Sequence, residues 1–124
     1  MRKKIILSAN TSWYLFNFRA STIQEFIRLN HEVICIAPED DYTQKLKNLG
    51  CIYVPLYMDN KGINPIKDAY LLFQFFRNYF LHKPDAIFHF TIKNNIYGTW
   101  AAKSLAIPAI NNISGLGTAF LSKG

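Results

Sequence analysis

The chain has 124 residues, half of them apolar, so it has room for one domain with a well-buried core and is not an intrinsically disordered protein. Lys and Arg total 14 against 8 Asp and Glu, and the formal net charge of +6 favours contact with phosphates, nucleic acid or an anionic membrane surface, with ordinary solubilising charge as the alternative. The apolar run after Lys4 is too short for a signal peptide, and no window approaches the roughly 20 apolar residues of a membrane span. We therefore expect a cytoplasmic protein, with peripheral attachment to the inner face of the cytoplasmic membrane left open.

Short runs rich in Ile, Val and aromatic residues alternate with helical patterns along the chain. These runs predict five strands, at Lys4 to Ala9, Glu32 to Ala37, Cys51 to Pro55, Asp85 to Phe90 and Pro108 to Ile113. The strands are almost continuously apolar, which is typical of a parallel sheet buried on both sides. The predicted fold class is α/β, a Rossmann-like open parallel sheet of five strands with helices on both faces.

The helical patterns between the strands have apolar faces. Phe16, Ile23 and Ile27 share one face of the first helix, and a short helix is predicted at Thr43 to Asn48. The fourth helix has a face formed by Tyr97, Trp100, Ala101 and Ser104. Such faces are typical of helices that cover a sheet.

The third helix, predicted from Pro65 to about Lys83, is apolar on two sides. One stripe contains Ile66, Ala69, Phe73, Phe76 and Phe80, and a second contains Leu71, Leu72, Phe75 and Tyr79. Only a narrow polar face remains, around Lys67, Gln74, Arg77 and Asn78. Two interpretations stay open, which are deeper burial within this domain or contact with a missing domain, a partner chain or lipid.

Polar side chains follow the first predicted strand, at the edge of the sheet where α/β proteins hold ligands. Asn10, Thr11 and Ser12 stand at the start of a helix that also carries Arg19. They can cap the helix, or the free helix N–H groups and Arg19 can face an anion. This segment has no glycine, which disfavours the close approach of a dinucleotide.

A denser polar segment follows the fourth strand and contains His89, Thr91, Lys93 and Asn94. A cation at a helix start is unfavourable unless an anion lies nearby, so Lys93 indicates a binding role. His89 alternates with its neighbours and points to the same side as Ile87, which makes a hydrogen-bonded core histidine the alternative to a functional one.

The segment after the fifth strand contains Ser114, Gly115 and Gly117, whose glycines would let the backbone approach a ligand closely, or form a plain mobile loop. Cys35 and Cys51 are predicted to be small, buried hydrophobic residues, and they indicate neither a disulfide nor a zinc site. No metal or cofactor is expected. The catalytic residue stays unassigned, with His89 as the one candidate.

Three segments in this order resemble the amino-terminal domain of family-4 glycosyltransferases of the GT-B fold, in the branch that builds bacterial surface polysaccharides such as capsule and lipopolysaccharide, and lipid-linked oligosaccharides. These segments are residues 5–19, 89–98 and 110–117, and residues 58–65 match the loop before the third helix. The likeness covers essentially the whole chain.

The resemblance implies a two-domain enzyme that transfers a sugar with retention of configuration. Residues 1–124 would be the amino-terminal domain, which binds the acceptor, and the carboxyl-terminal donor domain would be absent, so the chain alone is expected to be inactive. The implied partners are a nucleotide-sugar, a glycan acceptor on polyprenyl diphosphate and an anionic membrane surface, together with the missing domain or a partner subunit, and no nucleic acid.

The resemblance also suggests roles for the polar residues. Lys93 and Arg19 would contact phosphates, and sugar hydroxyls would be held by Asn10, Thr11, His89, Thr91 and Asn94. Two other functions stay open. One is a non-catalytic subunit of a split transferase that docks its donor subunit through Leu71, Phe75 and Tyr79. The other is an unrelated Rossmann-like ligand-binding protein.

Overall fold

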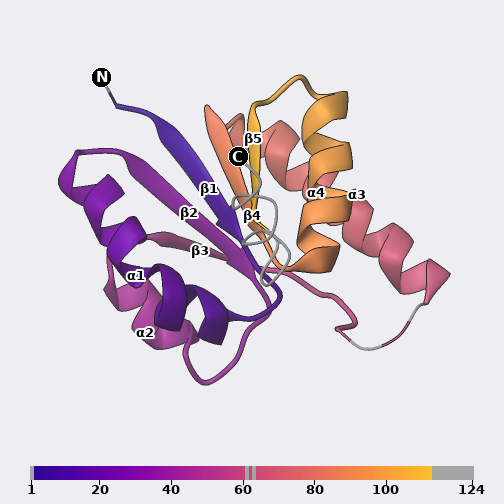
Figure 1. Cartoon of the computed structure of the whole chain (residues 1–124), viewed down its shortest axis with the longest axis horizontal. Helices are drawn as coiled ribbons and strands as arrows, with labels where there is room; N and C mark the ends of the chain where they lie inside the picture. The colour runs from indigo at the N-terminus through magenta and orange to yellow at the C-terminus, as the bar shows by residue number, and fades with distance from the viewer. Residues whose placement is uncertain (1, 61, 63, 113–124) are drawn as a thin grey trace, which may run out of the picture.

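Parallel strands form the centre of the molecule, in the order β3-β2-β1-β4-β5 (Figure 1). The computed structural model describes residues 2–60, 62 and 64–112. Within them the sheet contains five strands, which are β1 (Lys4–Ser8), β2 (Glu32–Ala37), β3 (Ile52–Pro55), β4 (Ala86–Phe90) and β5 (Ala109–Asn112). All five predicted strands are confirmed, each to within one residue at either end.

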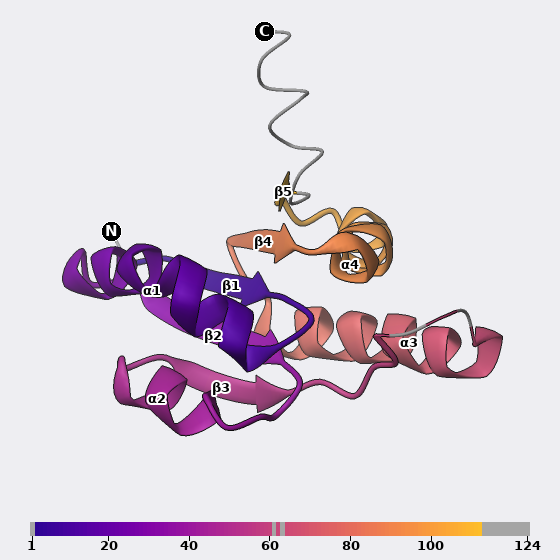
Figure 2. The same cartoon turned by 60° about the horizontal axis from the view of Figure 1, so that its bottom comes forward.

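Helices cover both faces of this sheet, as predicted. They are α1 (Ser12–Arg28), α2 (Thr43–Asn48), α3 (Pro65–His82) and α4 (Ile92–Ser104). Helices α1 and α2 lie on one face and α3 and α4 on the other (Figure 1, Figure 2). The chain winds outward from β1 to β3 and then returns to the other side of β1 to form β4 and β5, so the connections after β1 and β4 diverge. Open parallel sheets bind ligands at such a switch point.

The strands are buried on both sides, which explains their continuous apolar sequence. Ile5 and Leu7 of β1 face the core under α1 and α2, while Ile6 faces the core under α3 and α4. Cys35 and Cys51 are free, buried thiols in the first of these cores, as predicted.

Helix α3 buries only one of its two apolar stripes. Leu71, Phe75 and Tyr79 are fully buried against the sheet, so a partner subunit cannot dock through them. Phe73 and Phe80 of the other stripe are 59% and 63% exposed, and deeper burial of this stripe within the domain is therefore wrong. Gln74 is buried too, so the polar side of α3 is narrower than predicted. No helix in the described part of the chain is both long and apolar enough to cross a membrane.

The buried face of α4 also differs from the prediction. Trp100 is 58% exposed, and the face that packs on the sheet is formed by Asn94, Gly98 and Ala101 with their neighbours. The apolar pattern was misleading here because two buried positions of α4 hold amides with hydrogen-bond partners and a third holds glycine.

Candidate ligand site at the ends of β1 and β4

A cavity of about 280 Å³ lies where β1 and β4 end and their connections part. Its lining consists of Asn10, Met58, Asn60, Thr91, Ile92 and Lys93. Asn10 follows β1 and Thr91 follows β4, so the parallel sheet brings together residues 81 positions apart in the chain, as 91 − 10 shows. The structure thus places three of the predicted site residues, Asn10, Thr91 and Lys93, around one cavity.

Thr91 holds a strained backbone at the junction between β4 and α4. Its φ of 71° and ψ of 159° lie in a region that is essentially reserved for glycine, at a cost of about 1–3 kcal/mol. The Thr91 hydroxyl contacts the carbonyl oxygen of Phe90 and donates to Oδ1 of Asn94 at 3.0 Å. The Thr91 side chain makes no capping hydrogen bond to α4, and among the described residues the positive end of this helix is open toward the cavity.

Asn94 connects this junction to the neighbouring strand. Its Nδ2 donates to Oγ of Ser8 at the end of β1, at 2.8 Å, and both side chains are buried. Asn94 therefore holds the start of α4 against β1 and helps to set the shape of the cavity. Its role in binding a sugar stays a prediction.

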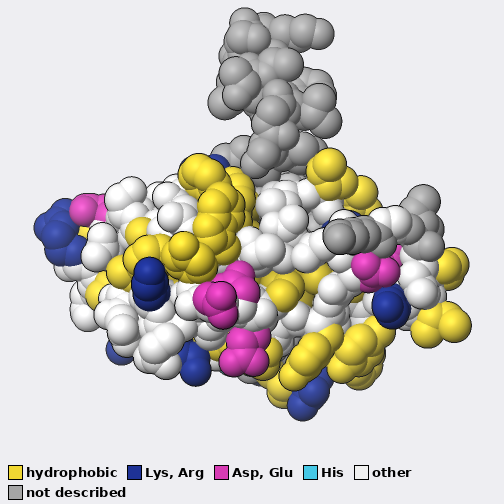
Figure 3. Space-filling view, turned by 90° about the horizontal axis from the view of Figure 1, so that it is seen from below, with side chains coloured by type: hydrophobic (Ala, Val, Ile, Leu, Met, Phe, Trp, Pro, Cys, Tyr) yellow, Lys and Arg dark blue, Asp and Glu magenta, His cyan; other side chains and the backbone are white. Residues whose placement is uncertain are grey.

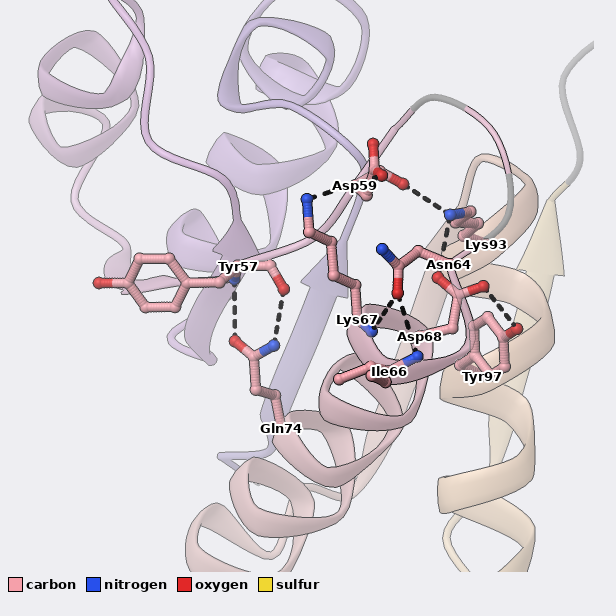
Figure 4. Close-up of polar contacts among 9 residues, drawn as sticks. All are labelled: Tyr57, Asp59, Asn64, Ile66, Lys67, Asp68, Gln74, Lys93 and Tyr97. Carbon is pink, nitrogen blue, oxygen red and sulfur yellow. Dashed lines mark hydrogen bonds and ion pairs between the residues drawn. The ribbon is translucent and has the colours of Figure 1, made fainter.

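Lys93 is not a free cation. Its Nζ lies 3.0 Å from Oδ1 of Asp68 and donates to the carbonyl oxygen of Asp59 at 2.6 Å (Figure 4). Tyr97 donates to the other Asp68 oxygen at 3.2 Å. Lys93 thus joins α4 to the start of α3. The role of Asp68 could not be predicted from the sequence, because Asp68 lies 25 residues from Lys93 and no local spacing connects the two.

Two backbone N–H groups at the start of α1 have hydrogen-bond acceptors within the protein. Thr11 caps the helix by accepting from the Tyr14 N–H at 2.9 Å, and the N–H of Trp13 donates to Oδ2 of Asp40 at 2.9 Å. Ser12 is buried, and its hydroxyl donates to the carbonyl oxygen of Pro38 at 2.7 Å. Thr11 is therefore the cap of α1, Ser12 joins the helix start to the segment after β2, and Asp40 already provides a carboxylate at this helix end.

Arg19 lies away from the cavity lining. Its guanidinium carbon stands 4.5 Å from the centre of the Phe90 ring, and Nη2 donates to the Tyr14 hydroxyl at 3.1 Å. The Nε atom is buried and has no hydrogen-bond partner among the described residues. Arg19 is thus held by cation–π contact beside the end of β4, and phosphate binding by it stays a prediction.

His89 is a core residue in the described structure and does not line the cavity. The Tyr79 hydroxyl lies 2.7 Å from Nε2, and Oδ1 of Asn111 lies 3.0 Å from Nδ1. Thr99 also donates to this Asn111 oxygen. Because a carbonyl oxygen only accepts, Nδ1 of His89 carries the proton and Nε2 accepts from Tyr79. Burial lowers the pKa of His89 to about 4, so the ring is neutral.

This low pKa predicts a loss of stability in mild acid. The unfolded chain binds a proton at His89 near pH 6.5 and the folded chain does so only near pH 4, so the contribution is intact above pH 6.5 and declines as the pH falls toward 4. We expect His89 to lower the free energy of unfolding by about 2 kcal/mol between pH 7 and pH 5. Urea unfolding of the wild type and of His89→Gln at both pH values measures this loss of stability, and equal pH dependence of the two proteins would contradict the prediction.

The remaining predicted site residues, Ser114, Gly115 and Gly117, lie outside the described residues. Residues 2–60, 62 and 64–112 contain no group of three side chains placed to bind a metal ion.

Comparison with known proteins identifies the kind of domain. A protein from Campylobacter jejuni, N,N′-diacetylbacillosaminyl-diphospho-undecaprenol alpha-1,3-N-acetylgalactosaminyltransferase, is 30% identical over 114 residues. The resemblance to glycosyltransferases is confirmed. The match covers 89% of this chain but 30% of the Campylobacter protein, so this glycosyltransferase-like domain spans less than a third of that relative. No protein-family model matches the chain.

Solved structures of glycosyltransferases share the fold. The glycosyltransferase of kitacinnamycin superposes with a TM-score of 0.73 and 16% identity over 90% of this chain and 30% of that protein. MurG of Acinetobacter baumannii gives a TM-score of 0.69 and 21% identity over 98% of this chain and 38% of that protein. The domain therefore has the Rossmann-like fold of one half of a GT-B glycosyltransferase.

Proposed function

We propose that this chain is the amino-terminal, acceptor-binding domain of a retaining glycosyltransferase. The enzyme would move a sugar from a nucleotide-sugar to a lipid-linked glycan acceptor in the synthesis of a surface polysaccharide. The observation that carries this proposal is the cavity between the ends of β1 and β4, which lies in a chain similar in sequence to a transferase that acts on an undecaprenyl-diphosphate-linked sugar. The nucleotide-sugar would bind mainly to a part of the enzyme beyond this domain.

The electrostatics of the cavity suit a ligand with a diphosphate. The uncapped start of α4 supplies a positive helix end, and Lys93 lies in the same wall. Because Asp68 pairs with Lys93, this cation is oriented before a ligand arrives. Hydroxyl groups of a sugar would meet the side-chain amides of Asn10 and Asn60. Nδ2 of Asn60 already donates to the backbone carbonyl oxygen of Asn10 at 3.0 Å, which holds the two segments together.

The test is a transfer assay with the protein encoded by the whole reading frame, incubated with bacterial lipid extract and labelled UDP-sugars. We expect label in the organic-soluble lipid. Asn10→Ala should lower kcat/KM about tenfold, equivalent to one lost hydrogen bond of about 1.4 kcal/mol, because this side chain lines the cavity.

The exposed residue Asn48 on α2 supplies the control, since Asn48→Ala should leave kcat/KM unchanged. Absence of label from every UDP-sugar would contradict the proposed activity. Turnover by residues 1–124 alone would contradict the proposal that the nucleotide-sugar binds mainly to another part of the enzyme.

A second part of the proposal is that the outer face of α3 docks on an anionic membrane. This face consists of Ile66, Phe73, Arg77 and Phe80, all exposed, and Lys67 lies beside it. In Figure 3, apolar side chains gather on the side of the molecule where α3 lies. Exposed apolar residues among cations suit the interface of an anionic leaflet, where each cation contributes about 1 kcal/mol.

We expect the protein to sediment with vesicles that contain anionic lipid and to remain in solution with neutral vesicles. The double variant Phe73→Ser, Phe80→Ser should reduce the bound fraction at least fivefold. Leu29→Ser, which removes an exposed apolar residue at the end of α1, is the control. Equal sedimentation of the wild type with both kinds of vesicle would contradict docking.

A further inference from the structure

A second and larger cavity, of about 530 Å³, lies over the ends of β2 and β3. Tyr57, Met58 and Asp59 follow β3 in its lining, and Tyr70 and Lys67 come from α3. Met58 lines both this cavity and the smaller one, so the two adjoin along the carboxyl edge of the sheet. No residue of the β1 and β4 ends lines the larger cavity.

One wall of the larger cavity is held in place by a buried amide. Gln74 of α3 is 7% exposed, accepts from the N–H of Tyr57 at 2.8 Å and donates to the carbonyl oxygen of Tyr57 at 2.7 Å (Figure 4). The Tyr57 backbone is therefore held in place, while the residue as a whole is 63% exposed. Tyr70, across the cavity on α3, is also exposed. Two exposed aromatic rings on a fixed framework are typical of a binding surface rather than of a core.

The charges of the larger cavity exclude an anionic guest. Glu39 and Asp59 contribute two carboxylates, and Lys67, the one cation among the lining residues, lies 3.9 Å from the Asp59 carboxylate. Figure 3 shows acidic side chains gathered near the middle of this edge of the molecule, with apolar side chains around them. Carboxylates accept hydrogen bonds from hydroxyl groups, and they repel phosphate.

We propose that this cavity is a saccharide subsite that holds a neutral pyranose ring. The apolar C–H face of the ring would pack on Tyr57 or Tyr70, and its hydroxyls would donate to Glu39 and Asp59. An isoprenoid tail would pack on the apolar lining but has no hydroxyl group to donate to Glu39 or Asp59. The assignment of this sugar to the transferase acceptor rests on the proposed function, whereas binding of the sugar does not.

The test is a titration of the isotope-labelled protein with three neutral disaccharides, N,N′-diacetylchitobiose, lactose and maltose, followed by amide chemical shifts. We expect at least one disaccharide to bind in the millimolar range and to shift the amides of residues 56–59 and 67–70. Tyr70→Ala and Glu39→Gln should each weaken this binding at least threefold. Trp100→Ala, which removes an exposed aromatic ring of α4 outside this cavity, should leave it unchanged.

The outcomes separate the subsite from the transferase activity. If none of the disaccharides shifts these amides, the subsite is overturned, whatever the transfer assay gives. If geranyl diphosphate shifts them instead, the cavity takes an anionic isoprenoid and the proposal is overturned as well. Disaccharide binding that is lost in Tyr70→Ala supports the subsite even when no sugar is transferred, and in that case only the proposed function fails.

Discussion

Replacing Lys93 by Met is expected to lower the free energy of unfolding by about 3 kcal/mol, because it leaves the Asp68 carboxylate with its charge uncompensated. The Lys93 and Asp68 side chains are 19% and 9% exposed, so water replaces the lost cation poorly. The carbonyl oxygen of Asp59 loses its donor in the same substitution. Urea unfolding followed by circular dichroism measures the loss.

The neighbouring pair provides a matched control. Lys67 and Asp59 lie 3.9 Å apart, and the Lys67 side chain is 62% exposed, so Lys67→Met should change the unfolding free energy by less than about 1 kcal/mol. The double variant Lys93→Met, Asp68→Asn should recover at least half of the loss, since the buried charge is then removed. Equal effects of Lys93→Met and Lys67→Met would show that the Lys93 pair is not a buried one.

Replacing Gly98 by Ala is expected to destabilise the fold by about 3 kcal/mol, the reverse of the usual effect of this substitution within a helix. A Cβ atom at Gly98 would lie 2.2 Å from Nε2 of His89, so the histidine ring has to move. That movement breaks the hydrogen bond from the Tyr79 hydroxyl and leaves a buried donor without an acceptor. The expected outcome is a lower urea midpoint with an unchanged slope.

A double-mutant cycle isolates this contact. In the His89→Ala background the ring is absent, so the additional loss caused by Gly98→Ala should fall below about 1 kcal/mol. Ile96→Ala, at an exposed position of the same helix, reports the effect of a surface substitution in α4. If Gly98→Ala still lowered the free energy of unfolding by about 3 kcal/mol in the His89→Ala background, the clash with the histidine would not be the cause.

These two contacts hold the elements around the proposed ligand site. Lys93 joins α4 to α3 beside the smaller cavity, and His89 with Gly98 packs α4 against β4 beneath it. The strained Thr91 stands between them and aims the open end of α4 at the cavity. Strain of this kind persists only where the surrounding structure holds it, which fits a site that is shaped before its ligand binds.

Local chemistry made much of the site predictable. Asn10, Thr91 and Lys93 follow strands, and the rule that parallel strands end at one edge places them together without knowledge of any contact. The capping role of Thr11 also follows from its place before a helix. The long-range partners were not predictable, because Asp68, which pairs with Lys93, and Asn111, which contacts His89, are distant in the chain from the residues they contact.

The pattern of apolar runs by itself determined the five strands, the alternation with helices and the parallel Rossmann-like sheet, because these depend on short-range periodicity and on the need to bury both faces of each strand. Tertiary structure alone decided which stripe of α3 is buried, since both stripes have helical spacing and only packing against the sheet distinguishes them. It also decided that His89 is a neutral core residue and that Lys93 is paired, because burial and charge compensation depend on residues brought close by the fold.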